Sequence, residues 1–227
     1  MKGRLIGALW ILGALVLFYF AFDGSEFSTL FIFCLLMCAA EIMSIAEWQP
    51  YRLRPDACKP NYIWNAEICI VCFAAICCMI LTREQILFIV LVSALSDVGA
   101  FTFGKLLGRH KAKFSASISP NKTIEGYIGG IICTTIIIPF MPLLGIEFSP
   151  QSISYLVIGG VVAEIGDLIG SATKRQLGIK DSGDGLRHLP VFRIIEYPLR
   201  GHGGYLDRLD SVSLGILFFS LLNVPQS

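Results

Sequence analysis

The sequence predicts an all-α polytopic membrane protein with about seven transmembrane helices. Of its 227 residues, 55% are hydrophobic and 15% are charged, and the mean hydropathy is +0.70. Soluble domains carry about 25% charged residues, so this composition lies well outside their range. The apolar residues are also grouped into runs that are long enough to cross a bilayer as helices. Three features therefore agree: composition, hydropathy and run length.

The first predicted span covers residues 5–22 and follows the positive charges of Lys2 and Arg4. Because no convincing cleavage site follows this run, we expect a retained anchor and not a signal peptide. The remaining predicted spans are residues 27–46, 63–81, 86–107, 124–146, 152–173 and a shorter 209–224.

The distribution of positive charge predicts the orientation of these spans. With a cytoplasmic N-terminus, 17 of the 18 Lys and Arg residues fall in cytoplasmic segments, and only Arg83 falls outside. Cytoplasmic loops of membrane proteins carry such an excess. A net charge of +1 gives no reason to expect a nucleic-acid partner, because binding a polyanion needs a basic surplus on one face.

The chain divides into N-terminal transmembrane helices, residues 1–95, and a catalytic transmembrane region, residues 96–227. The predicted cytoplasmic loops 108–123 and 174–208 are the only segments with room for a polar site. Cys69 and Cys72 form a C-x-x-C pair, but no second pair lies at metal-site spacing. We therefore interpret most of the eight cysteines as small core residues.

Carboxylates inside the predicted spans are the first candidates for function, because a charge at membrane depth is costly and usually has a partner. Asp97 and Lys105 lie two turns apart near one helical face, which predicts that they bracket a pocket and do not touch. Gly99 and Gly104 between them would allow another backbone or a ligand to approach closely.

A second polar stripe runs along the span 152–173. Glu164 and Asp167 are three residues apart, and Ser171, Lys174 and Arg175 continue towards the cytoplasmic end. This spacing predicts a track for metal and phosphate. We interpret Asp167 as functional, while for Glu164 a functional role and a buried structural network stay equally open.

The segment SPNKTIEG predicts a helix start. Ser119 suits the N-cap, Pro120 the first helical position and Glu125 the early turns. Free backbone N–H groups there, together with Lys122, would form an anion site. We interpret His110, just upstream, as a solvated residue.

The segment HGGYLDRLD places Asp207 and Asp210 three residues apart at the entry to the last span. Asp207 and Asp167 could supply carboxylate oxygens to magnesium, which keeps open positions for phosphate oxygens. Nearby cations would then neutralise a polyphosphate. The alternative is a basic loop that only binds anionic lipid, but the interleaved carboxylates argue against it.

Together these motifs resemble the phosphatidate cytidylyltransferases, also called CDP-diacylglycerol synthases. Their signature is approximately S-x-x-K-R-x4-K-D, a short spacer, and H-G-G-x-x-D-R-x-D. The upstream segments SDVGAFTFGKLLGRHK and SPNKTIEGYIGG are similar to two further family blocks, so the resemblance covers about residues 96–211. The matching signature residues are Ser171, Lys174, Arg175, Lys180, Asp181, His202, Gly203, Gly204, Asp207, Arg208 and Asp210.

Two departures from the family pattern stand out. Residues 184–200 form an insertion between the signature halves, partly apolar, which we expect to be a tolerated surface excursion such as an interfacial flap. The chain is also short for the family, by one or more N-terminal spans.

The resemblance implies transfer of CMP from CTP to phosphatidate, giving CDP-diacylglycerol and pyrophosphate in phospholipid biosynthesis. It implies Mg²⁺ held by Asp167 and Asp207, with K⁺ as a candidate second cation. The catalytic residues it implies are Asp167, Lys174, Arg175, Lys180, Asp181, His202, Asp207, Arg208 and Asp210. The substrate-binding residues are Asp97, Lys105, Asn121, Lys122, Ser171, Gly203 and Gly204.

The expected setting is a bacterial inner membrane, with the active site facing the cytoplasm and the lipid bilayer as a partner; pairing into a homodimer stays open. One alternative is a CTP-dependent polyprenol or phytol kinase, which would release CDP. A transporter is a second alternative, although it would be expected to show symmetry between halves and polar groups near the midplane. An inactive scaffold is the third.

Overall fold

The computed structural model describes residues 24–48, 62–144, 149–176 and 206–222, and the structural statements that follow concern these residues. The elements are α2 (Gly24–Trp48), α3 (Tyr62–Cys77), α4 (Arg83–Leu106), η3 (Lys113–Ser115), α5 (Ile124–Thr134), η4 (Thr135–Leu144), α6 (Pro150–Gln176) and α8 (Leu206–Leu222). The only extended pairing in this part of the chain is an isolated bridge between Lys111 and Thr123. The predicted all-α class is confirmed for the described residues.

Three helical segments are long and apolar enough to cross a membrane, judged by length and composition: Arg83–Leu106, Ile124–Pro142 and Pro150–Gln176. Shorter apolar helices cover Glu26–Leu36, Asn65–Cys77 and Leu209–Leu222. The first predicted span, residues 5–22, lies outside the described residues. The seven-span count and the orientation therefore stay predictions.

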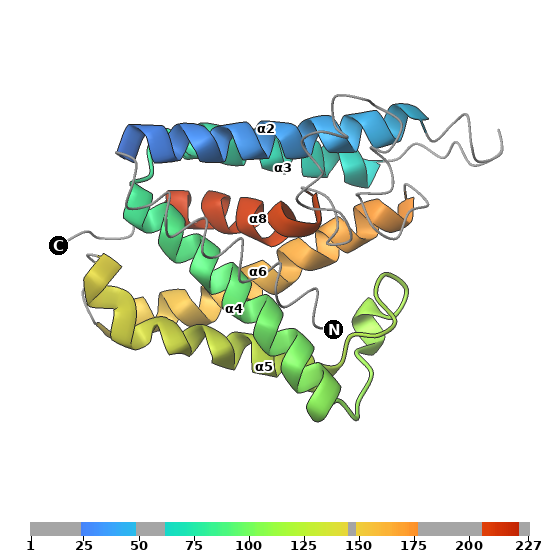
Figure 1. Ribbon diagram of the computed structural model, residues 1–227. Coiled ribbons are helices and arrows are strands. Elements are labelled where there is room, and N and C mark those ends of the chain that lie inside the picture. The colour runs from blue at the N-terminus through green and yellow to red at the C-terminus, as the bar shows by residue number, and fades with distance from the viewer. Residues whose placement is uncertain (1–23, 49–61, 145–148, 177–205, 223–227) are drawn as a thin grey trace, which may run out of the picture.

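The helices pack as a bundle (Figure 1). α2 and α3 run side by side, α8 lies between this pair and α6, and α4 packs along α5 on the other side of the molecule. Apolar side chains from several of these helices form one core, among them Leu35, Ile86, Leu156 and Ile216. The C-terminal ends of α4 and α6 and the N-terminal end of α5 lie at the same side of the molecule.

The start of α5 differs from the prediction. Thr123, and not Ser119, is the N-cap, and its side chain accepts a hydrogen bond of 3.1 Å from the Gly126 amide. Backbone bonds from Ala112 N to Lys122 O (3.1 Å) and from Ile124 N to His110 O (3.0 Å) hold the preceding residues extended. This pairing between chain segments outweighs the local Ser-Pro signal, so the helix cannot begin before Ile124.

The predicted span 124–146 also changes character along its length. It is α-helical only to Thr134 and continues as the 3₁₀ helix η4, which contains Pro139 and Pro142. Proline lacks the N–H that an α-helix interior needs, and tighter 3₁₀ turns are common at helix ends.

Glycines set the closest helix contacts. A Cβ on Gly99 of α4 would lie 2.6 Å from the Gly129 carbonyl oxygen of α5, and a Cβ on Gly166 of α6 would lie 2.6 Å from Ser211 Cα of α8. Only glycine allows backbones to come this close. The close approach predicted at Gly99 is therefore confirmed, and its partner is the α5 backbone.

Candidate active site

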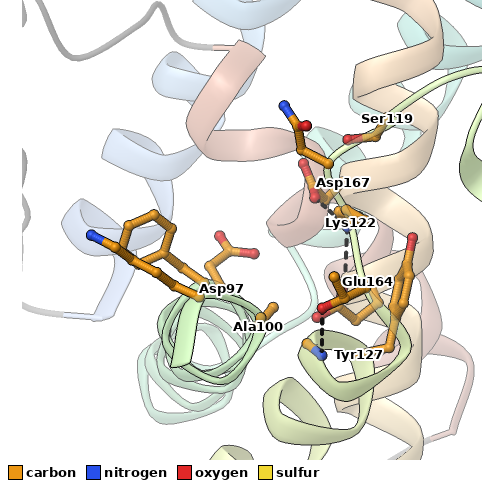
Figure 2. A pocket seen from close by; sticks show the side chains of 13 residues that line it. Asp97, Ala100, Ser119, Lys122, Tyr127, Glu164 and Asp167 are labelled. Atoms are coloured by element: carbon orange, nitrogen blue, oxygen red, sulfur yellow. Dashed lines mark hydrogen bonds and ion pairs between the residues drawn. The ribbon is translucent and has the colours of Figure 1, made fainter. Parts of the chain in front are cut away.

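A cavity of about 400 Å³ lies where α4, the loop before α5, the start of α5 and α6 meet. Its polar lining comes from all four elements, which are separated in sequence by up to seventy residues. Figure 2 shows these side chains around the opening. The charged and polar lining residues are Asp97, Lys105, Ser119, Asn121, Lys122, Thr123, Tyr127, Glu164 and Asp167.

Lys122 lies between the two α6 carboxylates (Figure 2). Its Nζ is 3.0 Å from Glu164 Oε2 and 2.5 Å from Asp167 Oδ2. The three-residue spacing puts both carboxylates on one face of α6, as the sequence predicted. Lys122 is supplied by a loop and not by a helix, because the extended pairing before Ile124 brings it to the side of α6 that carries Glu164 and Asp167.

Glu164 is fixed from two further helices. Ser96 Oγ of α4 donates a hydrogen bond to Glu164 Oε1 at 3.4 Å, and both residues are buried. On α5, a Cβ at position 130 would overlap the Glu164 carboxylate, so Gly130 leaves the space that this side chain occupies. A buried carboxylate with these partners is strongly constrained in position.

The charge on Lys122 is secured by its neighbours. Burial by itself would lower the pKa of Lys122, because it disfavours the ammonium form. The carboxylates of Asp167 and Glu164 outweigh that effect and raise the pKa of Lys122 above its usual value. A raised lysine pKa keeps the charged form at neutral pH, and this contribution would be lost only as the pH rises through that raised value.

An aromatic wall borders the same lysine. Lys122 Nζ lies 4.8 Å from the Tyr127 ring centroid, within the range of a cation–π contact, and the Phe114 ring lies 5.1 Å from that of Tyr127. The buried Tyr127 hydroxyl has no hydrogen-bond partner among the described residues. Tyr127 was not predicted, since an aromatic residue early in an apolar span gives no distinct signal.

Asp97 and Lys105 form the opposite wall. Both line the cavity from α4, and Figure 2 shows the Asp97 carboxylate across the opening from Lys122. Lys105 Nζ lies 5.8 Å from the Phe101 ring centroid. The cavity thus combines three carboxylates with two lysines.

Lys174 and Asp210, by contrast, do not line this cavity. Both are buried between α6 and α8, with Lys174 Nζ 3.9 Å from Asp210 Oδ2. Asp210 Oδ1 accepts a hydrogen bond from the Ser211 amide at 2.8 Å. A Cβ on Gly170 would overlap the Asp210 carboxylate, so this glycine provides the space for it.

The end of α6 is tied to the loop before α5. Arg175 is exposed, and its Nε donates a hydrogen bond of 3.2 Å to the Ile118 carbonyl oxygen. Ser171 is half-buried on α6 and is not among the residues that line the cavity. Arg175 therefore connects two elements that both contribute to the cavity wall.

His110 also holds this loop in place. Its exposed ring places Nδ1 2.6 Å from Glu125 Oε1, and its backbone N–H donates to the same carboxylate at 3.1 Å. The solvated position expected for His110 agrees with its exposure, but its pairing with Glu125 was not predicted.

Several predicted site residues cannot be placed. Lys180, Asp181, His202, Gly203 and Gly204 lie outside the described residues, as does the insertion 184–200. Asp207 and Arg208 lie in the first turn of α8, and the structure does not describe their side chains.

The carboxylates fit magnesium in kind. Mg²⁺ is usually held by one or two carboxylates, with waters and substrate phosphates completing its shell. Asp167 brings one carboxylate to the cavity, and Asp207 on α8 would be the second. No group of three or more His, Cys, Asp or Glu side chains arranged for a metal occurs within the described ranges, so an all-protein cage is not formed there.

The chain is similar to one protein family and to named bacterial proteins. Residues 59–224 match the family model described as the Cytidylyltransferase family. The chain is 41% identical over 144 residues to the phosphatidate cytidylyltransferase of Staphylococcus saprophyticus, which covers 62% of this chain and 48% of that protein. It is 42% identical over 146 residues to the protein of the same name from Staphylococcus haemolyticus, covering 63% and 50%.

The chain spans about half the length of the curated relatives that it matches. No solved structure matches it significantly.

Proposed function

Because the chain belongs to the cytidylyltransferase family, we propose that it transfers CMP from CTP to phosphatidate, forming CDP-diacylglycerol and pyrophosphate in phospholipid biosynthesis. The names of its relatives support this assignment. The observation that carries it is the cavity between the C-terminal halves of α4 and α6, where Lys122 lies between two carboxylates. Such a site can receive both phosphate groups and a divalent cation.

In the proposed reaction, a phosphate oxygen of phosphatidate attacks the α-phosphorus of CTP in line. The bond from this phosphorus to the oxygen that bridges to the β-phosphorus breaks, and pyrophosphate leaves with that oxygen. No protein nucleophile is needed, so catalysis comes from positioning the two substrates and neutralising their charge.

Asp167 and Asp207 would hold Mg²⁺, with K⁺ as the candidate second cation. When bound, the metal would neutralise negative charge on the CTP phosphates. The carboxylate of Asp167 at the cavity supports its part in this assignment.

The phosphate-binding groups divide by their position. Lys122, Lys105 and Asn121 line the cavity and would contact substrate phosphates or the nucleotide, while Asp97 shapes the opposite wall. Arg175 lies at the end of α6 and would act from the rim. The proposed site also includes the remaining signature residues, whose side chains lie outside the part of the chain that the structure describes: Lys180, Asp181, His202, Gly203, Gly204 and Arg208.

The burial of Lys174 and Asp210 favours a different role for them. We assign them to positioning α6 against α8, which would set the place of Asp167 relative to Asp207. Ser171, one turn beyond Asp167 on α6, would contact substrate only at the edge of the site.

The proposed topology has seven spans, a cytoplasmic N-terminus and the active site at the cytoplasmic face of a bacterial inner membrane. Lys105 and the pair Lys174 and Arg175 lie in the last turns of α4 and α6, and these helix ends lie at the same side of the molecule (Figure 1). Positive charge gathered at one side supports this orientation.

The test is pyrophosphate release by the detergent-purified protein with CTP, Mg²⁺ and phosphatidate. Release that requires phosphatidate is expected, and Asp207→Asn should abolish it while the protein stays folded. Glu26→Gln, an exposed carboxylate on α2, is the matched control and should leave release unchanged. Release of CDP with a polyprenol acceptor, or no release from a folded protein that binds CTP, would contradict the proposal.

A further inference from the structure

Lys122 and a divalent cation compete for the same carboxylate oxygen. Lys122 Nζ is 2.5 Å from Asp167 Oδ2, which is a close charge-assisted contact. A magnesium ion bound to this oxygen would lie about 2.1 Å from it. Two positive groups this close to one oxygen repel each other strongly, so Asp167 Oδ2 serves one of them at a time.

Glu164 gives the lysine a second anchor. Its Oε2 lies 3.0 Å from Lys122 Nζ, and its other oxygen is held by Ser96 at 3.4 Å. Gly130 leaves the space in which this carboxylate sits. When Lys122 releases Asp167, Glu164 therefore keeps the ammonium at the cavity.

The chemistry of lysine suits such an exchange. The ammonium is a point charge on a flexible four-carbon chain, so it can change partners without moving the backbone. The Tyr127 ring, 4.8 Å from Nζ, gives the charge an additional favourable surface within that reach.

We propose that Lys122 is an exchangeable counter-ion for Asp167: it neutralises this carboxylate until a divalent cation takes its place, and Glu164 retains it at the cavity to meet the incoming phosphates. The inference rests on the proposed function in taking Asp167 as a metal ligand. It assigns Glu164 the role of a positioning residue that acts through Lys122.

The test measures metal binding without turnover. The full chain, purified in detergent and without substrates, is titrated with Mn²⁺, and free Mn²⁺ is followed by its electron paramagnetic resonance signal. Loss of one charge-assisted contact that competes for the oxygen should tighten Mn²⁺ binding by roughly tenfold or more in Lys122→Met. Lys122→Gln should also tighten Mn²⁺ binding, and it replaces Lys122→Met in the test if that variant fails to fold.

Two further variants control for other causes. Lys105→Met removes the same charge from the opposite wall of the same cavity, and should change Mn²⁺ affinity by less than about twofold, since Lys105 is exposed and solvent and salt screen its charge. Asp167→Asn should weaken Mn²⁺ binding strongly in the wild-type and Lys122→Met backgrounds alike.

An unchanged or weaker affinity in both Lys122 variants would overturn the inference, and so would an equal gain in Lys105→Met. Absence of Mn²⁺ binding in every variant would overturn it together with the metal assignment. The pyrophosphate assay separates the two proposals. If pyrophosphate is released but Mn²⁺ affinity does not change as expected, the proposed reaction holds and the lysine exchange is wrong. If Mn²⁺ affinity changes as expected but no pyrophosphate is released, the exchange holds and the proposed reaction is contradicted.

Discussion

Lys122 and Lys174 both pair with carboxylates, but in opposite surroundings. Lys122 meets Glu164 and Asp167 at the wall of a cavity, and the Lys122 and Asp167 side chains are 19% and 31% exposed. Lys174 meets Asp210 between α6 and α8, where the side chains are 10% and 4% exposed. The family resemblance implies that Lys122, Asp167, Lys174 and Asp210 belong to one site, whereas the structure places the first two at a cavity and the last two between helices.

The geometry of α6 explains the difference. Gly166 and Gly170 are four residues apart and face α8, and Lys174, another four residues on, pairs with Asp210 of α8. Asp167 and Lys174 are seven residues apart, about two turns, so they lie on nearly the same side of α6. They differ in their place along the helix, since Asp167 lines the cavity and Lys174 is buried against α8. Charges on nearly the same side of one helix thus meet different surroundings, because neighbouring elements cover one part of α6 and leave a cavity at another.

The largest expected effect on turnover comes from Asp167 at the cavity. Asp167→Asn should reduce turnover by about 10² to 10³-fold, because it removes a fixed charge that positions the metal and phosphates. Thermal unfolding in detergent should stay within a few degrees of the wild type, since this side chain is partly exposed. Pyrophosphate release under saturating CTP checks the prediction, and turnover within a few-fold of wild type would break the comparison.

The buried pair of Lys174 and Asp210 should show the opposite result, a loss of stability. Lys174→Met or Asp210→Asn should each destabilise the protein by about 3 kcal/mol, because each leaves a charged or polar partner buried without compensation. The double variant Lys174→Met with Asp210→Leu should recover much of that loss, as a double-mutant cycle of unfolding free energies would measure. Single variants that unfold normally but lack turnover would instead place this pair at the substrate.

Two glycines allow a matched test. Gly130→Ala and Gly170→Ala each place a methyl group against a carboxylate, that of Glu164 in the first and of Asp210 in the second. Overpacking of this kind costs about 1–3 kcal/mol. We expect Gly130→Ala to raise the KM for CTP and Gly170→Ala mainly to lower the unfolding temperature. If both variants changed the KM for CTP and the unfolding temperature in the same way, the expected difference between the two groups of charges would be wrong.

The smallest expected effect on kinetics comes from Arg175 at the end of α6. Arg175→Met removes the hydrogen bond to the Ile118 carbonyl and loosens the loop that carries Lys122. A hydrogen bond from a charged donor contributes about 1.5–3 kcal/mol, and less when exposed, so a several-fold rise in KM is expected. Arg109→Met, which removes an exposed charge from the same loop, should change KM less, and steady-state kinetics compare the two.

The sequence predicted those features that depend on local pattern. Apolar runs placed the helices, and a spacing of three placed Glu164 and Asp167 on one face of α6. It also predicted a close contact at Gly99, although not the backbone that Gly99 meets.

Features that depend on distant neighbours were not accessible in the same way. The Ser-Pro signal placed the start of α5 too early, because pairing between His110 and Ile124 decided it. Lys174 continues the Asp167 stripe along α6 as predicted, but nothing in the sequence says that α8 covers it there. Ser96 could have been suspected as a polar partner inside an apolar span, whereas the space left by Gly130 requires three helices to be in place.

The position of Lys122 in the chain also bears on biosynthesis. A carboxylate costs about 2.5–3.5 kcal/mol when a helix carrying it at its centre is inserted into a membrane. α6 carries two, and Lys122 precedes Glu164 by 42 residues, so it is synthesised first. Since chains emerge from the ribosome in order, the two carboxylates of α6 are synthesised after the cation that pairs with both of them.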